Sequence, residues 1–188
     1  MREVFSMIFN DLYRFKASKF FVQFLFEIFF GNVYKYIFWF RLCSYLKQKR
    51  LLKYTLYPFG RLIFDHYIYR FGISIPLGTK IDNGIYITHF GGIVIHKDVV
   101  IGKNFTISHG VTIGKLHEGE KAGCPMIGDN VYIAPGAKIF GNIKIGNNVV
   151  IGANAVVIND IINDVTVGGI PAKIISNNNS SKIIKNKV

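Results

Sequence analysis

The stretch Ile95-His-Lys-Asp-Val-Val-Ile101-Gly-Lys-Asn-Phe-Thr-Ile107, with its continuation to Val157, decides the fold of this chain. Aliphatic side chains return there every six residues, at Ile95, Ile101, Ile107, Ile113, Ile127, Ile133, Ile139, Ile145, Ile151 and Val157. A period of six is neither that of a helix face nor that of an alternating strand. It is the period of a structural repeat, and a repeat outranks local propensity.

Each hexapeptide is long enough for one short strand and one tight turn, and turns such as Ile101-Gly-Lys-Asn carry the Gly and Asn that tight turns favour. Three such strands close one triangular coil of about eighteen residues. Coils then stack by parallel strand pairing about 4.8 Å apart, so that each aliphatic side chain lies on its counterpart in the next coil. The spacing therefore predicts a mainly β protein, a parallel β-helix.

Two irregular steps predict insertions in this helix. Ile87 and Ile95 are eight residues apart instead of six, so two extra residues should bulge out at 90–92. The step that ends at Ile127 is fourteen residues, which predicts an eight-residue loop around 115–124. Such a loop can leave the coil at the surface without interrupting the stack.

The composition divides the chain near residue 71. Residues 1–70 hold 22 of the 28 aromatic residues and 12 Lys and Arg against 4 Asp and Glu, a net charge of +8 out of +12 for the whole chain. We expect a helical, aromatic and basic segment over 1–70, the β-helix domain over 71–175, and a disordered polar tail over 176–188. Half of the residues are apolar, which is enough for a sizeable core.

The N-terminal segment is apolar enough to require a partner. Polar residues interrupt its apolar run at Gln23, Glu27, Asn32 and Lys35. These interruptions argue against a spanning helix and favour amphipathic helices that lie on a membrane surface. A basic cluster that would face anionic lipid follows at Lys47, Lys49, Arg50 and Lys53. The alternative is that the aromatic side chains pack on one another or on a neighbouring subunit.

Bulk features also bound the location of the protein. Cys43 and Cys124 provide no disulfide framework, which indicates a reducing compartment. No convincing signal peptide opens the chain. We expect a cytoplasmic protein that makes peripheral contact with the inner face of the cytoplasmic membrane. We expect no nucleic-acid partner.

Two of the five histidines are placed for chemistry. His89 and His109 each follow a repeat aliphatic by two residues and are twenty residues apart, which is one coil plus the two bulged residues. They should therefore stack on adjacent coils at one corner, where an imidazole can accept a proton at neutral pH. The alternatives are two exposed turn histidines, or a metal site without clearly spaced acidic or thiolate ligands. His96 and His117 are expected to be solvated.

Several segments resemble the hexapeptide acyltransferases, and within them the serine acetyltransferase branch. The segments are Thr88-His-Phe-Gly-Gly-Ile-Val-Ile95, His109-Gly-Val-Thr-Ile-Gly114, Ala134-Pro-Gly-Ala-Lys-Ile139, Gly141-Asn-Ile143 and Gly169-Ile-Pro-Ala-Lys173. Both irregular steps match that branch. The resemblance implies a left-handed parallel β-helix, a homotrimer and acetyl-CoA as co-substrate, with no metal.

The chain departs from that branch on the acceptor side. Thr88 and Ser74 stand where the resembling family carries Asp, and Gly123-Cys124-Pro125 replaces an Arg-His-Pro that helps to hold the carboxylate of serine. The short aromatic N-terminus and the 122–125 loop resemble the O-acetyltransferases of capsule and exopolysaccharide synthesis. This implies transfer to a sugar hydroxyl, often on a lipid-linked saccharide, in surface polysaccharide biosynthesis. The alternatives are a serine O-acetyltransferase of cysteine biosynthesis with altered acceptor contacts, and a non-catalytic β-helix scaffold.

The resemblance also implies roles for individual residues. His89 would be the general base, and His109 would orient the acceptor or tune His89. Ser74 would hydrogen-bond the His89 ring, with Thr88 and Cys124 beside the acceptor. Cys124 could act as a thiol nucleophile, but nothing nearby in the sequence marks it as activated. The donor-side residues are Gly114, Lys115, Ala134, Ala153 and Lys173.

Overall fold

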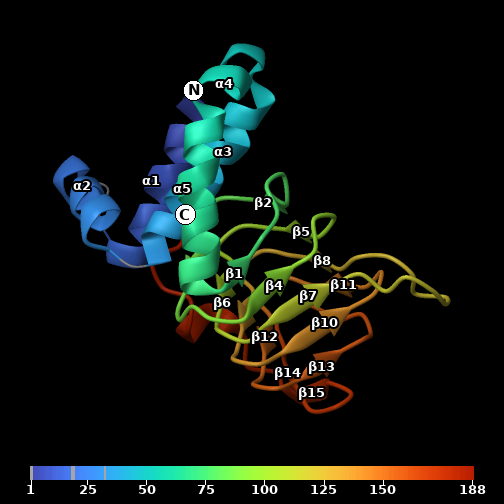
Figure 1. The fold of residues 1–188 in the computed structure, drawn as a ribbon. Helices are drawn as coiled ribbons and strands as arrows, with labels where there is room; N and C mark the ends of the chain where they lie inside the picture. The colour runs from blue at the N-terminus through green and yellow to red at the C-terminus, as the bar shows by residue number, and fades with distance from the viewer. Residues whose placement is uncertain (1, 18–19, 32) are drawn as a thin grey trace.

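The computed structural model describes residues 2–17, 20–31 and 33–188, and Figure 1 shows a group of helices standing on one end of a β-coil. The polar interruption expected at Asn32 lies outside the described residues. The helices are α1 (Arg2–Lys16), α2 (Phe21–Phe29), α3 (Val33–Gln48), α4 (Arg50–Thr55) and α5 (Tyr57–Phe71). Since α5 ends at Phe71 and the first strand begins at Ile73, the helices give way to the coil where the composition changes.

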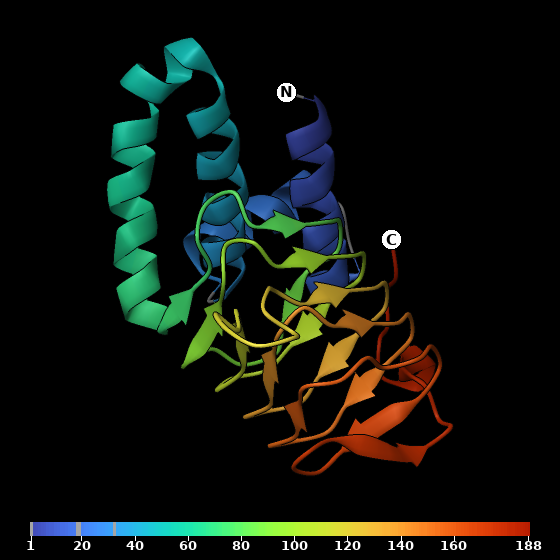
Figure 2. The same cartoon turned by 90° about the vertical axis from the view of Figure 1, so that its right-hand side faces the viewer.

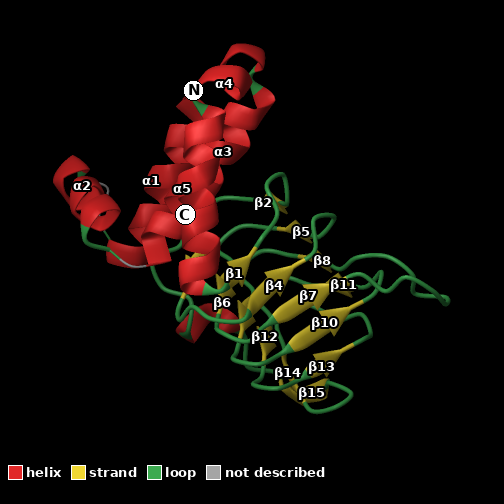
Figure 3. Cartoon of the chain, in the orientation of Figure 1, coloured by secondary structure: helices red, strands yellow, loops and turns green. Residues whose placement is uncertain are grey.

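The coil is built from three sheets of very short strands, which Figure 3 shows as a ladder of arrows on each face. One sheet contains β1 (Ile73–Ser74), β4 (Ile93–Ile95), β7 (Thr112–Gly114), β10 (Lys138–Phe140) and β13 (Val156–Val157). A second contains β2 (Lys80–Ile81), β5 (Val100–Ile101), β8 (Met126–Ile127) and β11 (Lys144–Ile145). The third contains β3 (Tyr86–Ile87), β6 (Thr106–Ile107), β9 (Tyr132–Ile133), β12 (Val150–Ile151), β14 (Thr166–Gly168) and β15 (Lys173–Ser176).

The predicted fold class, a left-handed parallel β-helix preceded by helices, is confirmed. Every strand pair is parallel except β14 with β15. The six-residue repeat sets the register, because Ile87 pairs with Ile107 and Ile107 pairs with Ile133. The repeat aliphatics form one continuous core and are at most 4% exposed between Ile81 and Val157. Burial of each such side chain contributes about 1.5–3 kcal/mol.

Asparagine fixes the turns at one corner of the coil. Asn104, Asn130 and Asn148 have φ between 54° and 58°, the left-handed region that Asn tolerates better than most residues. Their side-chain amides form a ladder from coil to coil, with Nδ2 to Oδ1 distances of 3.0 Å from Asn104 to Asn130 and 2.9 Å from Asn130 to Asn148. The Asn of each turn therefore serves both the backbone conformation and the stacking of coils.

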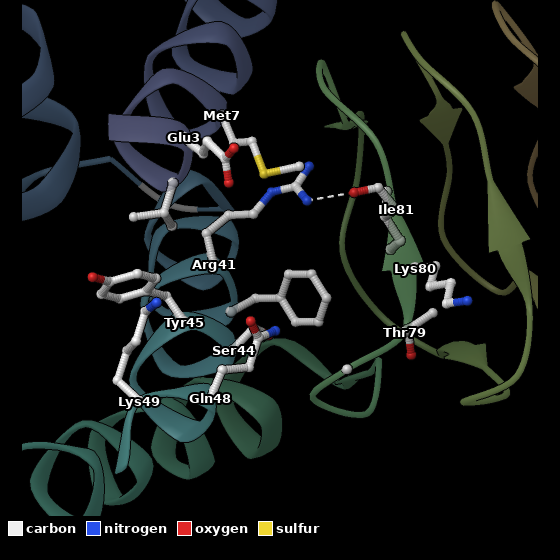
Figure 4. Close-up of a pocket in the computed structure, with 13 residues that line it drawn as sticks. Glu3, Met7, Arg41, Ser44, Tyr45, Gln48, Lys49, Thr79, Lys80 and Ile81 are labelled. Carbon is white, nitrogen blue, oxygen red and sulfur yellow. Dashed lines mark hydrogen bonds between the residues drawn. The ribbon is translucent and has the colours of Figure 1, made fainter. Parts of the chain in front are cut away.

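A buried ion pair joins the helices to the first coil. Arg41 of α3 donates to both carboxylate oxygens of Asp11 of α1, at 2.9 and 3.4 Å, and also to the carbonyl of Asp82. It donates as well to the carbonyl of Ile81 (Figure 4). Asp11 in turn accepts from the backbone N–H of Gly84, and neither charged side chain is more than 6% exposed. Burial raises the pKa of Asp11, while Arg41 and the backbone donors oppose that rise. The helical segment is thus packed against the coil through a network that water does not reach.

The C-terminal residues differ from the disordered tail that was expected. After the antiparallel β14–β15 pair, the chain forms a 3-10 turn at Ser180–Lys182 and returns along the coil towards α1 (Figure 2). Ser180 and Ile184 are buried, and the N–H of Val188 donates to Asn104 at 2.8 Å. The composition is polar, but the segment makes hydrogen bonds to the asparagine corner of the coil, through the backbone of Val188 and the hydroxyl of Ser180.

Across the part of the chain that the structure describes, no helix is both long enough and apolar enough to cross a membrane.

Replacing Arg41 with Met should lower the free energy of unfolding by about 3–5 kcal/mol, the usual cost of leaving one partner of a buried ion pair without its counter-charge. Urea denaturation followed by circular dichroism measures this loss. Arg61→Met is the matched control, because it breaks the more exposed pair with Asp65 and should cost less than about 1 kcal/mol. Equal losses in the two variants would contradict the structural role of the Asp11–Arg41 pair.

Candidate functional site

The histidine pair occupies the corner of the coil that follows the third sheet. His89 follows β3 and His109 follows β6, and since Ile87 pairs with Ile107 the two histidines lie one above the other. Their ring centroids are 6.0 Å apart and the ring planes cross at 75°. Both side chains are exposed. The stacking expected from the twenty-residue spacing is therefore present, and both imidazoles can reach a bound molecule.

Hydroxyl groups support this corner from the side of the strands. The Oγ1 of Thr88 and the Oγ of Ser108 are 2.8 Å apart, and the Thr88 hydroxyl also donates weakly to the carbonyl of Ile107 at 3.4 Å. Gly110 gives the chain its turn after His109, with φ of 70°, and an added Cβ there would meet Gly136 at 3.5 Å. The histidines are thus carried on a well-defined backbone.

A cavity of about 420 Å³ lies between His89 and the N-terminal helices. Besides His89 and Thr88 it is lined by Lys16 of α1 and Glu27 of α2. The Lys16 ammonium lies 3.1 Å from the Glu27 carboxylate, whose side chain is only 6% exposed. Sequence reasoning missed both residues. In the sequence, Glu27 stands out only as a single carboxylate in an apolar run. Nothing in the sequence indicates that α2 folds back beside His89.

Small residues continue the histidine column towards the far end of the coil. Since Ile107, Ile133, Ile151 and Val167 are in register, the residues two positions later form one line: His109, Pro135, Ala153 and Gly169. Ala134 lies beside this line and is buried, whereas Ala153 is exposed. Lys173 of β15 pairs with Gly168 at its end. Three of the predicted donor-side residues, Ala134, Ala153 and Lys173, therefore share the corner of the histidines.

Gly114 and Lys115 do not share that corner within one chain. Gly114 ends β7 and Lys115 follows it, so both lie at the opposite end of that strand from His109. The ring of Phe140 also covers Gly114, because an added Cβ there would meet it at 2.4 Å. These two residues can meet the histidines only across a boundary between chains.

Ser74 is not brought to His89. It is exposed on β1, in register with Val94, and lines a different cavity with Lys47, Arg61 and Lys97. No hydrogen bond joins it to the histidine ring, so the carboxylate that the resembling family places there has no replacement in Ser74 within this chain.

Cys124 lies at the corner of Gly114. Its Sγ is 3.2 Å from the Nδ1 of His96, a residue expected to be merely solvated. Burial raises the pKa of the Cys124 thiol, Asp98 raises it further and Lys115 lowers it. Desolvation raises the pKa of the buried Cys43 thiol to about 12. Neither cysteine therefore has the lowered pKa of an activated nucleophile.

A second cavity, of about 310 Å³, lies between α1, α3 and the turn before β2 (Figure 4). Glu3, Met7, Ser44 and Lys49 are among the residues that line it, and none is a histidine or a cysteine. It offers neither an imidazole nor a thiol, so the histidine corner remains the candidate active site.

The six-residue repeats and the parallel coil are features that this chain shares with hexapeptide-repeat proteins. The family model described as "Bacterial transferase hexapeptide (six repeats)" matches residues 125–159.

The similar proteins are serine acetyltransferases. The serine acetyltransferase of Staphylococcus epidermidis is 43% identical over 132 residues, which cover 70% of this chain and 62% of that protein. The one from Staphylococcus aureus is 42% identical over the same length and coverage. The chain thus matches less than two thirds of the length of these relatives.

Solved structures show the same likeness. Serine acetyltransferase from Brucella abortus superposes with a TM-score of 0.72 at 27% identity, covering 96% of this chain and 70% of that one. The enzyme from Neisseria gonorrhoeae gives 0.74 at 29% identity, covering 94% and 66%. The Brucella abortus enzyme in complex with coenzyme A gives 0.73 at 28% identity, covering 94% and 68%.

These findings correct the expected acceptor. A sugar hydroxyl in surface polysaccharide biosynthesis is wrong as the main reading, because the relatives at 42–43% identity and these structural neighbours are named serine acetyltransferase. A changed set of contacts at Ser74, Thr88 and Cys124 would not require a different class of acceptor. The names of these relatives favour the alternative, a serine acetyltransferase with altered acceptor contacts.

Proposed function

We propose that this protein is an acetyl-CoA-dependent serine O-acetyltransferase whose acceptor contacts differ from those of its relatives. The observation that carries the proposal is the stacked pair His89 and His109 beside a cavity that holds charges of both signs. The likeness to serine acetyltransferases, one of them solved with coenzyme A, supports the choice of both substrates.

In this proposal His89 is the general base. The serine hydroxyl oxygen forms a bond to the thioester carbonyl carbon while His89 takes the hydroxyl proton. The carbon–sulfur bond then breaks, and the imidazolium returns the proton to the sulfur of coenzyme A. No acyl-enzyme is needed, since the nearest thiol, that of Cys124, is at another corner of the chain and has a raised pKa. His109, stacked on His89, orients the acceptor.

Glu27 and Lys16 are the proposed acceptor contacts. Free serine carries an ammonium and a carboxylate, and the cavity beside His89 presents one group of each opposite sign. Charged hydrogen bonds of this kind are the strong ones. The arrangement supplies the recognition that the missing Arg-His-Pro would otherwise give, and it does so from the helical segment.

The donor groove is proposed to run along the small-residue line below the histidines, past Ala134 and Ala153 to Lys173. Gly114 and Lys115 would come from a neighbouring chain. A homotrimer, in which the strand ends of one coil face the histidine corner of the next, is the assembly that completes such a site.

Replacing His89 with Ala should lower kcat by about 10²–10⁴, the usual effect of losing a general base. The assay follows release of free coenzyme A with serine as acceptor and alanine, which lacks the hydroxyl, as the blank. His109→Ala should cost less, and His66→Ala on α5 should leave turnover unchanged. Wild-type turnover in His89→Ala would disprove the base, and no release above the alanine blank in the wild type would disprove the function.

Replacing Glu27 with Gln should raise the KM for serine by about 10- to 100-fold, because a charged hydrogen bond contributes about 1.5–3 kcal/mol. The KM for acetyl-CoA should stay unchanged. If Glu27 only supported the fold, its replacement would be expected to change both KM values. Glu3→Gln, at the other cavity, is the matched control. If both KM values rise together, or if neither does, Glu27 is not an acceptor contact.

The exposed aromatic surface of α2 is proposed to make peripheral contact with an anionic membrane. It comprises Phe20, Phe21, Phe26, Phe29 and Phe30, each more than half exposed. The basic cluster at Lys47, Lys49, Arg50 and Lys53 contributes to the +8 charge of the same segment. Exposed aromatic side chains suit a membrane interface, and the net positive charge of the segment suits anionic lipid.

The full chain should sediment with vesicles that contain anionic lipid and only partly dissociate in high salt, because salt screens the lysines but not the buried rings. Neutral vesicles should retain less protein. A variant with Phe26 and Phe29 replaced by Ser should remain in the supernatant while its circular dichroism is unchanged. Equal recovery of the wild type in the supernatant with and without vesicles would leave subunit packing as the function of this surface.

A further inference from the structure

Three potential metal ligands meet at the corner where the loop 115–124 returns to the coil. His96 and Asp98 belong to the turn after β4, and Cys124 ends the loop. The Sγ of Cys124 is 3.2 Å from the Nδ1 of His96, and that nitrogen is 3.9 Å from the Oδ2 of Asp98. One ligand atom from each of the three residues lies within 4.8 Å of the others. In the described part of the chain this cluster has three members and no fourth.

These separations fit tetrahedral coordination. Zinc binds thiolate sulfur at about 2.3 Å, imidazole nitrogen at about 2.0–2.1 Å and carboxylate oxygen at about 2.0–2.2 Å. At tetrahedral angles those bonds place neighbouring ligand atoms about 3.3–3.6 Å apart. The observed 3.2 and 3.9 Å bracket that range, so small side-chain rotations suffice to close the site.

The Nδ1 of His96 accepts from the backbone N–H of Asp98 at 3.2 Å, so this nitrogen is unprotonated in that arrangement. A metal ion would take over its one lone pair, and this backbone hydrogen bond would be given up as the ion binds. The His96 and Asp98 side chains are 36% and 62% exposed, which leaves an open coordination position for water.

The three donors stand on backbone that is already fixed. The N–H of His96 bonds the carbonyl of Ile113 at 2.8 Å, which holds the first turn on the coil. Leu116 and Gly123 exchange two backbone hydrogen bonds, of 2.9 and 2.8 Å, which close the base of the loop next to Cys124. Main-chain hydrogen bonds therefore preorganise the cluster, independently of the three ligand side chains.

We propose that His96, Asp98 and Cys124 bind one Zn²⁺ per chain, with water as the fourth ligand. The Cys124 thiol loses its proton to solvent as the sulfur binds, and the ion fastens the end of the loop to the turn after β4. Thiolate and carboxylate together balance the charge of the ion. Within one chain this site is separate from the histidine corner, and it does not rest on the proposed activity.

The test is titration of the metal-free full chain with Zn²⁺ by calorimetry, and with Co²⁺ by absorption spectroscopy. We expect one ion per chain and a thiolate-to-cobalt charge-transfer band in the near ultraviolet. Cys124→Ser should abolish the band, and His96→Ala and Asp98→Asn should each weaken Zn²⁺ binding by more than about tenfold, the loss that even outer partners of metal ligands produce. Asp98 is exposed, so Asp98→Asn should fold as the wild type does.

Two controls make the outcome decisive. His117→Ala changes an exposed histidine of the same loop and should leave Zn²⁺ affinity unchanged. His109→Ala tests the other candidate, the stacked histidines. If His109→Ala loses the ion while Cys124→Ser keeps it, the metal belongs to the histidine corner and the proposal is wrong. The proposal also fails if the metal-free chain takes up no Zn²⁺, or if the three ligand variants bind as the wild type does.

Discussion

The constraint on which the rest of the structure depends is the register of aliphatic side chains from one coil to the next. Ile87, Ile107 and Ile133 pair directly, and each covers its neighbour in a core from which water is excluded. A coil cannot shift by one residue without moving that whole set outward. Extra residues must therefore leave at corners, which is where the Phe90 bulge and the loop 115–124 are found. This rule also determines where the candidate site residues lie. At a corner, a side chain of the coil can face solvent while its backbone stays fixed.

The second constraint on the structure is the buried pair of Asp11 and Arg41, which holds the helices on the first coil. Arg41 also bonds the carbonyls of Ile81 and Asp82, so α3 docks directly on coil backbone. Separating the two partners would leave a buried charge without its counter-charge, at a high cost in free energy. The pair therefore favours one orientation of the helices. That orientation places Glu27 and Lys16 beside His89. In the proposed function, the acceptor contacts therefore come from the helical segment and the base comes from the coil.

The sequence predicts what repeats and spacing control, and little of what depends on distant contacts. The β-helix, the bulge, the loop and the stacking of His89 on His109 all follow from counting residues between aliphatics. Glu27 and His96 were missed as site residues because their partners lie far away in the chain, and no periodicity connects α2 to β3 or Cys124 to the turn after β4. The tail was misjudged for a related reason: Asn and Ser are typical of disorder when alone, but here they meet a ladder of asparagines that supplies hydrogen bonds. The acceptor was misjudged because missing contacts were taken as a change of substrate, whereas the helices offer other groups for the same role.

The separation of the two corners has a consequence for assembly. Strand β7 has His109 before it, ends at Gly114 and is followed by Lys115, so the two ends of one strand face different surfaces of the coil. A site that needs both cannot form within one chain, whatever its loop conformation. In the proposed trimer, the end of β7 in one chain faces the histidines of the next, and the loop 115–124 becomes part of the neighbour's site. A loop at a boundary between chains must keep a defined conformation, and the backbone hydrogen bonds between Leu116 and Gly123 hold its base.

A metal ion bound to Cys124 would also attach the end of the loop to the turn after β4. The departure of Cys124 from the resembling family is then understood as a change in how the loop is held, and the acceptor is still selected by the charged pair beside His89.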